Sequence, residues 1–173
     1  MELAKARPED LPLLKEHYDA IIDRTPGMER HARWKKGLYP TEACLRAYIG
    51  ENAMYLLAAD GGIAASMAVT MQQGADYRPV LWGAAAGDGE VAVIHVLGVN
   101  PAWQGRGLGG RMIDEALRLA AEQRKKAVRL DALATNAPAR RLYAAKGFVC
   151  RGTRRLYAEN TGWTEFCFYE RAL

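Results

Sequence analysis

A glycine-dense loop between an apolar segment and an amphipathic segment constrains this chain more than any other feature. The aliphatic run at residues 91–99 is typical of a strand buried on both faces. Residues 104–110 then hold four glycines in seven positions, and apolar side chains recur at helical spacing after them. Because backbone N–H groups at a helix start are unpaired and the helix dipole is positive there, the sequence predicts an anion-binding turn.

Two interpretations of this loop compete. The pattern Gly105-x-Gly107-x-x-Gly110, with Asp131 after the next predicted strand, matches the dinucleotide-binding fingerprint. That fingerprint normally opens a chain of several parallel strands, whereas here about half the chain precedes it, and residues 101–103 lengthen a connection that should be short. A Walker phosphate loop is excluded, because no Lys-Ser or Lys-Thr follows the glycines.

A second interpretation accounts for more of the chain. The pattern Gln104-x-x-Gly107-x-Gly109, preceded by Leu-Gly-Val-Asn-Pro at 97–101, resembles motif A of the GNAT superfamily of acyl-CoA-dependent N-acyltransferases. The segment 136–148, Asn-Ala-Pro-Ala-Arg-Arg-Leu-Tyr-Ala-Ala-Lys-Gly-Phe, is similar to the second signature of that family. Both lie in the expected order and spacing, and together they cover roughly residues 91–150.

The periodicity predicts an α/β protein. Helices are predicted from residue 8 to before Pro26 and at 41–50, 107–126 and 136–146, with a further short helix at 28–38; strands are predicted at 2–7, 53–59, 63–72, 91–99, 127–133, 148–157 and 163–171. Asp60-Gly61-Gly62 is a hairpin turn signal, and residues 74–89 have loop composition. We expect a single mixed, splayed sheet of six to seven strands flanked by about four helices. The resemblance implies one GNAT-like domain over residues 1–173, with an acceptor-side half at 1–89 and an acetyl-CoA-binding half at 90–173.

The resemblance also assigns cofactor-binding residues. In that family the pantetheine arm of the cofactor lies in the splay and pairs with strand backbone, which falls here on Leu97 and Val99. The glycine loop would hold the diphosphate of acetyl-CoA through its main-chain amides, while the Arg106 side chain either adds charge or points to water. Asn136 resembles a cofactor-side polar residue and is also a good helix N-cap. The implied loop residues are Gln104, Gly105, Arg106, Gly107, Leu108, Gly109 and Gly110.

Tyr143 matches the usual general acid of the family, which protonates the departing thiolate. On reference pKa values a phenol near 10 donates uphill to a thiolate near 8.5 by about 2 kcal/mol, so the proton must move as the sulfur charge develops. The alternative is that Tyr143 is an amphipathic helix residue that packs against the sheet.

His95 interrupts the apolar strand on the same alternation as Leu97 and Val99. An imidazole with a reference pKa of ~6.5 accepts a proton near neutrality, and arylalkylamine-type members of the family carry a histidine at the similar position. This chain departs from their two-histidine pattern, because Val93 stands where the other histidine would be. Three roles for His95 remain open. It could act as a base directly, act as a base through water, or be a core residue whose hydrogen bonds are made within the protein.

Charge is unevenly distributed along the chain. The overall net charge is +4, but residues 1–100 carry −3 and residues 101–173 carry +7. The basic half contains the glycine loop, which suits a polyanionic cofactor such as coenzyme A. Nucleic acid is not expected as a partner, because the basic clusters are short and scattered and no nucleic-acid-binding motif accompanies them. Cys44, Cys150 and Cys167 have no metal-ligand spacing, so free thiols and no metal site are expected.

The predicted activity is transfer of an acetyl group from acetyl-CoA to the primary amine of a small molecule or a protein; a homodimer is compatible with it. The alternatives are a non-catalytic acyl-CoA-binding regulator and a dinucleotide-dependent oxidoreductase. Met1-Glu2 lacks a basic leader and no apolar run approaches ~18 residues, so a cytoplasmic protein without membrane contact is expected. Residues that could line the acceptor site are His31, Trp34, Tyr39, Tyr77, Trp82, Trp163 and Glu165.

Overall fold

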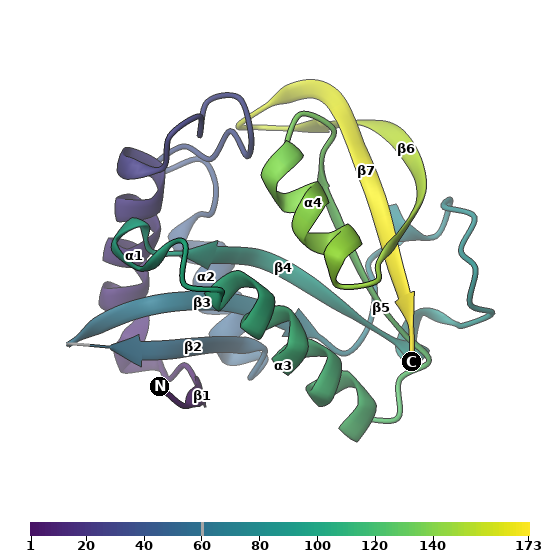
Figure 1. The fold of residues 1–173 in the computed structure, drawn as a ribbon, viewed down its shortest axis with the longest axis horizontal. Coiled ribbons are helices and arrows are strands. Elements are labelled where there is room, and N and C mark those ends of the chain that lie inside the picture. The colour runs from purple at the N-terminus through teal and green to yellow at the C-terminus, as the bar shows by residue number, and fades with distance from the viewer. Residues whose placement is uncertain (60) are drawn as a thin grey trace.

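A computed structural model describes residues 1–59 and 61–173 (Figure 1). In this part of the chain the helices are α1 (Leu11–Arg24), α2 (Glu42–Gly50), α3 (Leu108–Glu122) and α4 (Ala137–Ala145), with short 3-10 turns at Pro8–Asp10, Ala75–Tyr77, Asp88–Glu90 and Pro101–Trp103. The strands are β1 (Leu3–Lys5), β2 (Met54–Ala59), β3 (Gly62–Thr70), β4 (Val91–Val99), β5 (Ala127–Leu133), β6 (Val149–Ala158) and β7 (Gly162–Ala172). The predicted α/β class and order of elements are confirmed.

Within the described residues the strands form one seven-stranded sheet in the order β1-β2-β3-β4-β5-β7-β6. Neighbouring strands are antiparallel except β4 and β5, which run parallel. The parallel pair is in register only at Val91–Val93, and the strands then diverge, so that the sheet opens toward the end of β4. The predicted splayed, mixed sheet is therefore confirmed, and its strand number lies at the upper end of the expected range.

Helices cover both faces of the sheet (Figure 1). α1 and α2 bury Leu14, Tyr18 and Leu45 against one face, together with Val96 of β4. α3 and α4 bury the opposite face, where Met112 belongs to a continuous core with β2, β3 and β4. Because each helix has one apolar stripe, this arrangement buries both faces of the central strands, as the almost entirely apolar sequence of β4 requires.

Helix α3 shows how the sequence pattern determines packing. Its buried side chains recur at helical spacing, while Glu115, Arg118 and Glu122 form ion pairs on the exposed face. The prediction that this helix continues to residue 126 is wrong. The helix ends at Glu122 because Arg124 takes a positive φ of 54°, and Lys125 donates to main-chain oxygens outside the helix.

One other prediction of local structure is wrong. Residues 28–38 form turns and not a helix, because Arg33 and Gly37 both take positive φ values and Lys35 pairs with Tyr39 in an isolated bridge. The predicted hairpin between β2 and β3 is present as an antiparallel pair, and Gly61 has a φ of +76°. Asp60 of the predicted turn lies outside the described residues.

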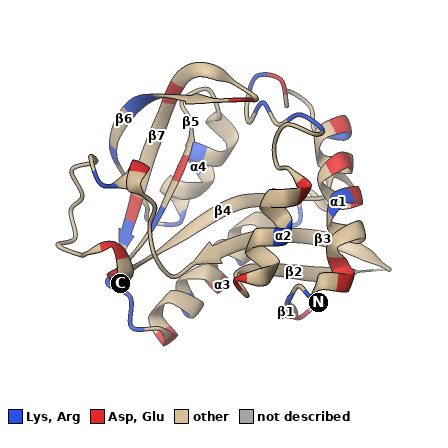
Figure 2. Ribbon diagram, turned by 180° about the vertical axis from the view of Figure 1, so that it is seen from behind, with Lys and Arg blue, Asp and Glu red and all other residues tan. Residues whose placement is uncertain are grey.

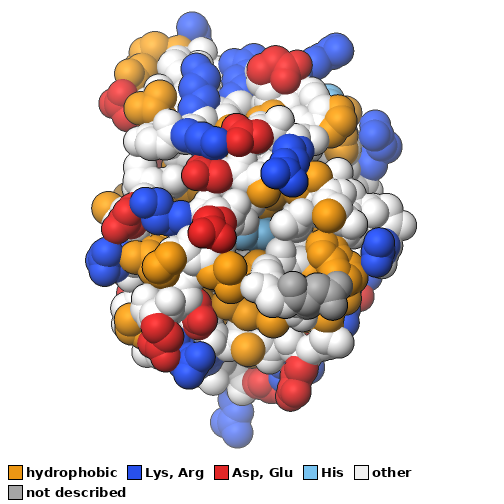
Figure 3. Space-filling view, turned by 90° about the vertical axis from the view of Figure 1, so that its left-hand side faces the viewer, with side chains coloured by type: hydrophobic (Ala, Val, Ile, Leu, Met, Phe, Trp, Pro, Cys, Tyr) orange, Lys and Arg blue, Asp and Glu red, His pale blue; other side chains and the backbone are white. Residues whose placement is uncertain are grey.

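Surface charges are mixed in sign around α1. Figure 3 looks onto the side of the molecule where α1 lies and shows acidic, basic and apolar side chains interspersed. Exposed ion pairs there include Lys15–Glu42 at 2.8 Å and Lys36–Asp23 at 2.5 Å. Basic residues follow β6, as Figure 2 shows from behind, in agreement with the basic C-terminal half of the sequence. Exposed pairs of this kind contribute little to stability, so packing holds the fold together.

His17 of α1 makes stability sensitive to acid. Its side chain is 3% exposed; Nδ1 lies 3.1 Å from Ile63 O, and Nε2 has no hydrogen-bond partner among the described residues. Burial lowers the pKa of His17 to about 4, whereas the unfolded chain titrates near 6.5. Between these values the unfolded state binds more protons. The stability that the protein gains by keeping His17 neutral is therefore present above pH 6.5 and is lost as pH falls toward 4.

We expect this histidine alone to remove about 2 kcal/mol from the free energy of unfolding between pH 7 and pH 4.5. Urea unfolding of the wild type and of His17→Leu at both pH values measures the effect as the difference between the two pH-dependent losses. Equal losses for the two proteins would show that His17 titrates normally in the folded state.

Candidate active site

The opening between β4 and β5 leaves main chain of β4 available. On the other side of β4, the amide of Asn100 donates to Ala64 O of β3 at 2.9 Å. Because main-chain groups alternate along an antiparallel strand, those of Leu97 and Val99 point away from β3 and into the opening. Both residues line the cavity described below. Main chain placed in this way can pair with an extended ligand.

A β-bulge at Val96 interrupts β4 where it lines this opening. Its φ is +46°, a conformation that β-branched residues rarely adopt, and the register with β3 shifts between Ser66 and Ala68. The buried Tyr18 hydroxyl donates to Val96 O at 2.7 Å and accepts a hydrogen bond from Ser66 Oγ at 2.9 Å. These two hydrogen bonds from α1 and β3 hold the strained main chain in place.

The bulge turns His95 to the opposite face from Leu97 and Val99, so the prediction that all three share one face is wrong. The imidazole stacks on Tyr48 of α2 with ring centroids 5.5 Å apart, and Nε2 lies 3.1 Å from Thr70 Oγ1. Leu97 and Val99 instead pack against the core beneath α3. His95 still borders the cavity, and burial lowers its pKa to about 4, so its side chain is neutral at pH 7.

The glycine loop forms the N-terminus of α3, as predicted. Gly105 and Gly107 have φ values of +75° and +76°, and a Cβ atom at either would meet no atom within 4 Å. Glycine is therefore required at these positions by the positive φ of the main chain, and not by lack of space for a side chain. Arg111 N donates to Gly107 O at 3.1 Å, but the amides of residues 105–110 have no acceptor in the described structure. The loop thus presents a row of free N–H groups beside open space, an arrangement suited to an anion.

Gly109 and Gly110 have a different environment. A Cβ atom on Gly109 would lie 3.1 Å from Leu142, and one on Gly110 would lie 3.0 Å from Lys146. Both contacts are to α4. These glycines therefore allow α3 and α4 to approach closely, which places the start of α3 next to the helix that carries Tyr143.

The two long polar side chains of the loop are engaged by the protein itself. Gln104 Nε2 donates to Val99 O at 3.3 Å and to Thr25 Oγ1 at 3.4 Å, which ties the loop to the end of β4 and to α1. The Arg106 guanidinium lies 4.6 Å above the ring of Trp103. Gln104 therefore positions the loop, and Arg106 holds its positive charge at the exposed rim of the loop.

Tyr143 and Asn136 reach the cavity from α4 and the turn before it. Tyr143 is 8% exposed, packs on Tyr169 at 5.6 Å, and its hydroxyl has no hydrogen-bond partner among the described residues. Burial raises the pKa of Tyr143, so the hydroxyl stays protonated. Asn136 Oδ1 accepts from Ala139 N at 3.3 Å, which confirms the predicted N-cap, and the residue also lines the cavity.

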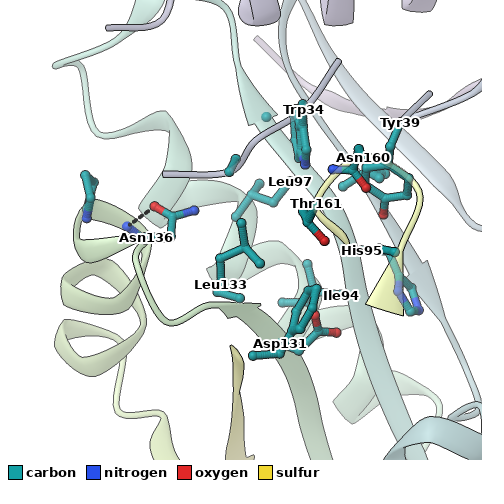
Figure 4. Close-up of a pocket in the computed structure, with 18 of the residues that line it drawn as sticks. Trp34, Tyr39, Ile94, His95, Leu97, Asp131, Leu133, Asn136, Asn160 and Thr161 are labelled. Atoms are coloured by element: carbon teal, nitrogen blue, oxygen red, sulfur yellow. Dashed lines mark hydrogen bonds between the residues drawn. The ribbon is translucent and has the colours of Figure 1, made fainter. Parts of the chain in front are cut away.

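One cavity of about 920 Å³ joins the glycine loop, the opened end of β4 and the face between α1 and the β6–β7 hairpin. Of the predicted acceptor-side residues, Trp34, Tyr39, Tyr77 and Trp163 line it. Figure 4 shows Trp34 and Tyr39 among the lining side chains. His31, Trp82 and Glu165 do not line the cavity. The His31 ring forms a hydrogen bond with Thr135 O at 3.2 Å. Trp82, which belongs to the loop at 74–89, stacks on Tyr77 of the same loop.

Asp131 of β5 places a carboxylate in this cavity. Its Oδ1 accepts a hydrogen bond from the Tyr77 hydroxyl at 2.6 Å, and no other donor to it occurs in the described part of the chain. Burial raises the pKa of Asp131 above its ordinary value.

The interpretation of Asp131 as the acid of a dinucleotide-binding fold is wrong. That fingerprint needs a parallel sheet, whereas this sheet is antiparallel except between β4 and β5.

Sequence patterns did not reveal the buried pair of Arg129 and Glu170. Their side chains are 1% and 0% exposed and lie 2.9 Å apart on β5 and β7. The residues are 41 positions apart, so only the pairing of the two strands brings them together. The available signal was Arg129 within the mostly apolar sequence of β5, with Glu170 next to an apolar and aromatic run in β7.

Among residues 1–59 and 61–173, no group of three or more His, Cys, Asp or Glu side chains has the arrangement of a metal site. No helix in the same residues is long and apolar enough to cross a membrane.

Comparisons with known proteins agree with this geometry. The profile of the acetyltransferase (GNAT) family matches residues 16–148. N-alpha-acetyltransferase RimI of Mycobacterium tuberculosis is 41% identical over 69 residues, which covers 40% of this chain and less than half, 42%, of that protein.

Solved structures resemble the whole chain. A ribosomal-protein-alanine N-acetyltransferase from Brucella melitensis has a TM-score of 0.72 at 18% identity, with all of both chains covered. The acetyltransferase yncA from Salmonella typhimurium, solved with acetyl-CoA, has a TM-score of 0.71 at 18% identity and covers 100% of this chain and 94% of its own. At these identities the likeness shows the shared fold.

Proposed function

Since the chain belongs to the acetyltransferase (GNAT) family, we propose that it transfers an acetyl group from acetyl-CoA to a primary amine within a ternary complex. The observation that carries this proposal is the single cavity that joins the free amides of the glycine loop to the Tyr143 hydroxyl and the Asp131 carboxylate. One end of the cavity is built for an anion and the other has aromatic walls and a negative charge. The two substrates can therefore meet between them.

The cofactor half fits acetyl-CoA, which supplies an activated acetyl thioester. The amides of residues 105–110 hold the diphosphate, and the main chain of Leu97 and Val99 pairs with the pantetheine arm. Asn136 lines the same end of the cavity. The solved relative from Salmonella typhimurium, which shares the fold, contains this cofactor.

Tyr143 acts as the general acid and Asp131 receives the acceptor. The amine enters as an ammonium and gives one proton to Asp131, after which the nitrogen attacks the thioester carbonyl. As the C–S bond breaks, the Tyr143 hydroxyl protonates the sulfur, and the remaining extra proton on nitrogen restores that hydroxyl. Burial favours both roles, because it keeps Tyr143 protonated and raises the proton affinity of Asp131.

The acceptor is the free amine of a polypeptide. The names of two relatives, an N-alpha-acetyltransferase and a ribosomal-protein-alanine N-acetyltransferase, support this class of acceptor. Tyr157 and Trp163 stand at the outer end of the cavity, 55% and 64% exposed, with ring centroids 5.9 Å apart. Exposed aromatic rings at this position can contact the residues that follow the acetylated amine.

Release of free thiol from acetyl-CoA in the presence of peptides with free N-termini tests the proposal. We expect thiol release that requires the free amine, and none with the same peptides acetylated beforehand. Binding of acetyl-CoA without thiol release across peptides and small amines would support the alternative of a non-catalytic acyl-CoA-binding regulator.

His95 is the second candidate base, acting directly or through water. Because its pKa is lowered to about 4, the side chain is neutral from pH 6 to 9 and its contribution does not change over that interval. We expect His95→Ala to lower kcat by less than about 10-fold, equally at each pH, with unchanged affinity for acetyl-CoA. Steady-state rates at pH 6, 7.5 and 9 measure this; a loss comparable to that of an Asp131 variant would make His95 the principal base.

A further inference from the structure

The loop at residues 74–89, which carries Tyr77, is fastened to the sheet by a buried carboxylate. Glu170 Oε1 accepts hydrogen bonds from the amides of Gly83 and Ala84 at 2.8 and 3.1 Å and from Arg151 Nε at 3.1 Å. Its other oxygen accepts from Arg129. A loop that has no strand partner is thus held by charge-assisted hydrogen bonds to β7 and β5.

Arg129 connects this anchor to an aromatic side chain. Its guanidinium donates to Gln73 Oε1 at 2.6 Å and to Ala84 O at 3.2 Å, and lies 4.1 Å from the ring centroid of Trp82. The cation is almost fully buried, so the contact with the ring is strong. Arg129 therefore binds the residue before the loop and a residue in its second half, and it fixes the plane of Trp82.

Trp82 in turn fixes Tyr77. Its Nε1 donates to Tyr77 O at 2.8 Å, and the two rings are stacked with centroids 5.8 Å apart and an interplanar angle of 14°. Phe168 of β7 closes the other side of the Tyr77 ring, edge-on at 5.3 Å. With its ring and its main chain both held, the Tyr77 side chain has one orientation, in which the hydroxyl donates to Asp131 at 2.6 Å.

We propose that Trp82, held by the buried Arg129–Glu170 pair, is a positioning residue that orients Tyr77 and through it aims the Asp131 carboxylate at the acceptor amine. The proposal rests on the proposed function, in which Asp131 receives that amine. Trp82 itself does not line the cavity, and it acts only through the two side chains beyond it. A hydrogen bond from a fixed phenol leaves the second carboxylate oxygen directed to the acceptor.

Other groups near Asp131 also influence its charge. From the described elements packed around it, Asp76 and Tyr77 of the Ala75–Tyr77 turn shift the pKa of Asp131. Together with burial, the Asp131 carboxylate in turn raises the pKa values of Tyr39 in the α1–α2 loop, Tyr48 of α2 and Tyr143 of α4. Asp76 raises the pKa of Asp131, whereas the Tyr77 hydroxyl lowers it. Removing that hydroxyl must therefore raise the pKa of Asp131 further.

Tyr77→Phe and Trp82→Phe test the proposal, with Tyr55→Phe as a matched control outside the cavity. We expect Tyr77→Phe to move the acid limb of kcat/KM for the acceptor upward by about one pH unit, because a charge-assisted hydrogen bond is lost. Trp82→Phe keeps an aromatic ring but removes the donor to Tyr77 O. We expect Trp82→Phe to shift the acid limb of kcat/KM upward by a smaller amount than Tyr77→Phe does. Its kcat/KM should fall about 3- to 10-fold, and the Kd of acetyl-CoA should be unchanged.

The outcomes separate this inference from the proposed function. If the wild type acetylates amines while Tyr77→Phe keeps its pH profile and rate, the positioning role is absent and the acetyltransferase remains. If Tyr77→Phe shows the shift and Trp82→Phe matches the Tyr55→Phe control, the orientation of Asp131 does not depend on Trp82 and the proposal fails at that step. Should Trp82→Phe not fold, Arg129→Lys, which loses the bidentate pairing with Glu170, has the same expected shift.

Discussion

Replacing Tyr143 with Phe lowers kcat for amine acetylation by about 10²-fold, because removal of a positioned general acid typically costs 10²- to 10⁴-fold. The variant loses only a hydroxyl that makes no hydrogen bond within the described residues, so the packing on Tyr169 and the affinity for acetyl-CoA should stay as they are. Burial raises the pKa of Tyr143, so the loss should be the same from pH 6.5 to pH 9.

Thiol release under saturating acetyl-CoA measures this effect, and a thermal unfolding midpoint close to that of the wild type confirms that the variant folds. Tyr55→Phe, on β2 and away from the cavity, is the matched control for loss of a phenol. If Tyr143→Phe turns over like Tyr55→Phe, the thiolate leaves without protonation by this residue, and its place in the cavity reflects packing alone.

Asp131→Asn lowers kcat/KM for the acceptor by about 10²- to 10³-fold, as expected for removal of a general base. Asn keeps the size of the side chain and its carbonyl oxygen can still accept from the Tyr77 hydroxyl, so the geometry is retained while the charge and the basic site are lost. In the wild type, activity should rise with pH as Asp131 loses its proton. Because burial raises the pKa of Asp131, this rise lies at higher pH than for an exposed aspartate.

The pH dependence of kcat/KM for wild type and Asp131→Asn decides the assignment: the variant should lose the acid limb as well as the rate. Comparison with His95→Ala at each pH identifies which of the two side chains accepts the proton. An Asp131→Asn enzyme with wild-type kcat/KM would leave attack by an amine deprotonated in solution as the mechanism, and Asp131 would be a structural carboxyl group.

The structure around the glycine loop could be predicted because its signals are local. An apolar run, a cluster of glycines and a helical repeat follow one another within residues 91–122, and each specifies its own backbone. The N-cap at Asn136 and the sheet class could be predicted for the same reason. The conformations of Gly105 and Gly107 follow directly from a sequence that uses glycine where φ is positive.

The surroundings of Asp131, His95 and Trp82 could not be predicted because they depend on contacts between distant segments. Asp131 becomes a cavity carboxylate only when Tyr77, 54 positions earlier, reaches its oxygen. The face of His95 depends on one extra residue in β4, and nothing in an apolar sequence marks a bulge. Trp82 was expected at the acceptor site because it is aromatic, yet it lies under a guanidinium whose partner comes from the last strand.

The bulge at Val96 has a consequence for how this protein can diverge. Deleting Val96 would restore regular pleating and leave Leu97 and Val99 on the face that they occupy now, but it would remove the carbonyl that accepts a hydrogen bond from the buried Tyr18 hydroxyl. An insertion or deletion elsewhere in the strand would swap every later side chain between the two layers of the molecule, whereas point substitutions keep their direction. We therefore expect descendants of this chain to keep the length of β4 even where residue identity changes. Insertions and deletions should accumulate instead in the connections at the surface.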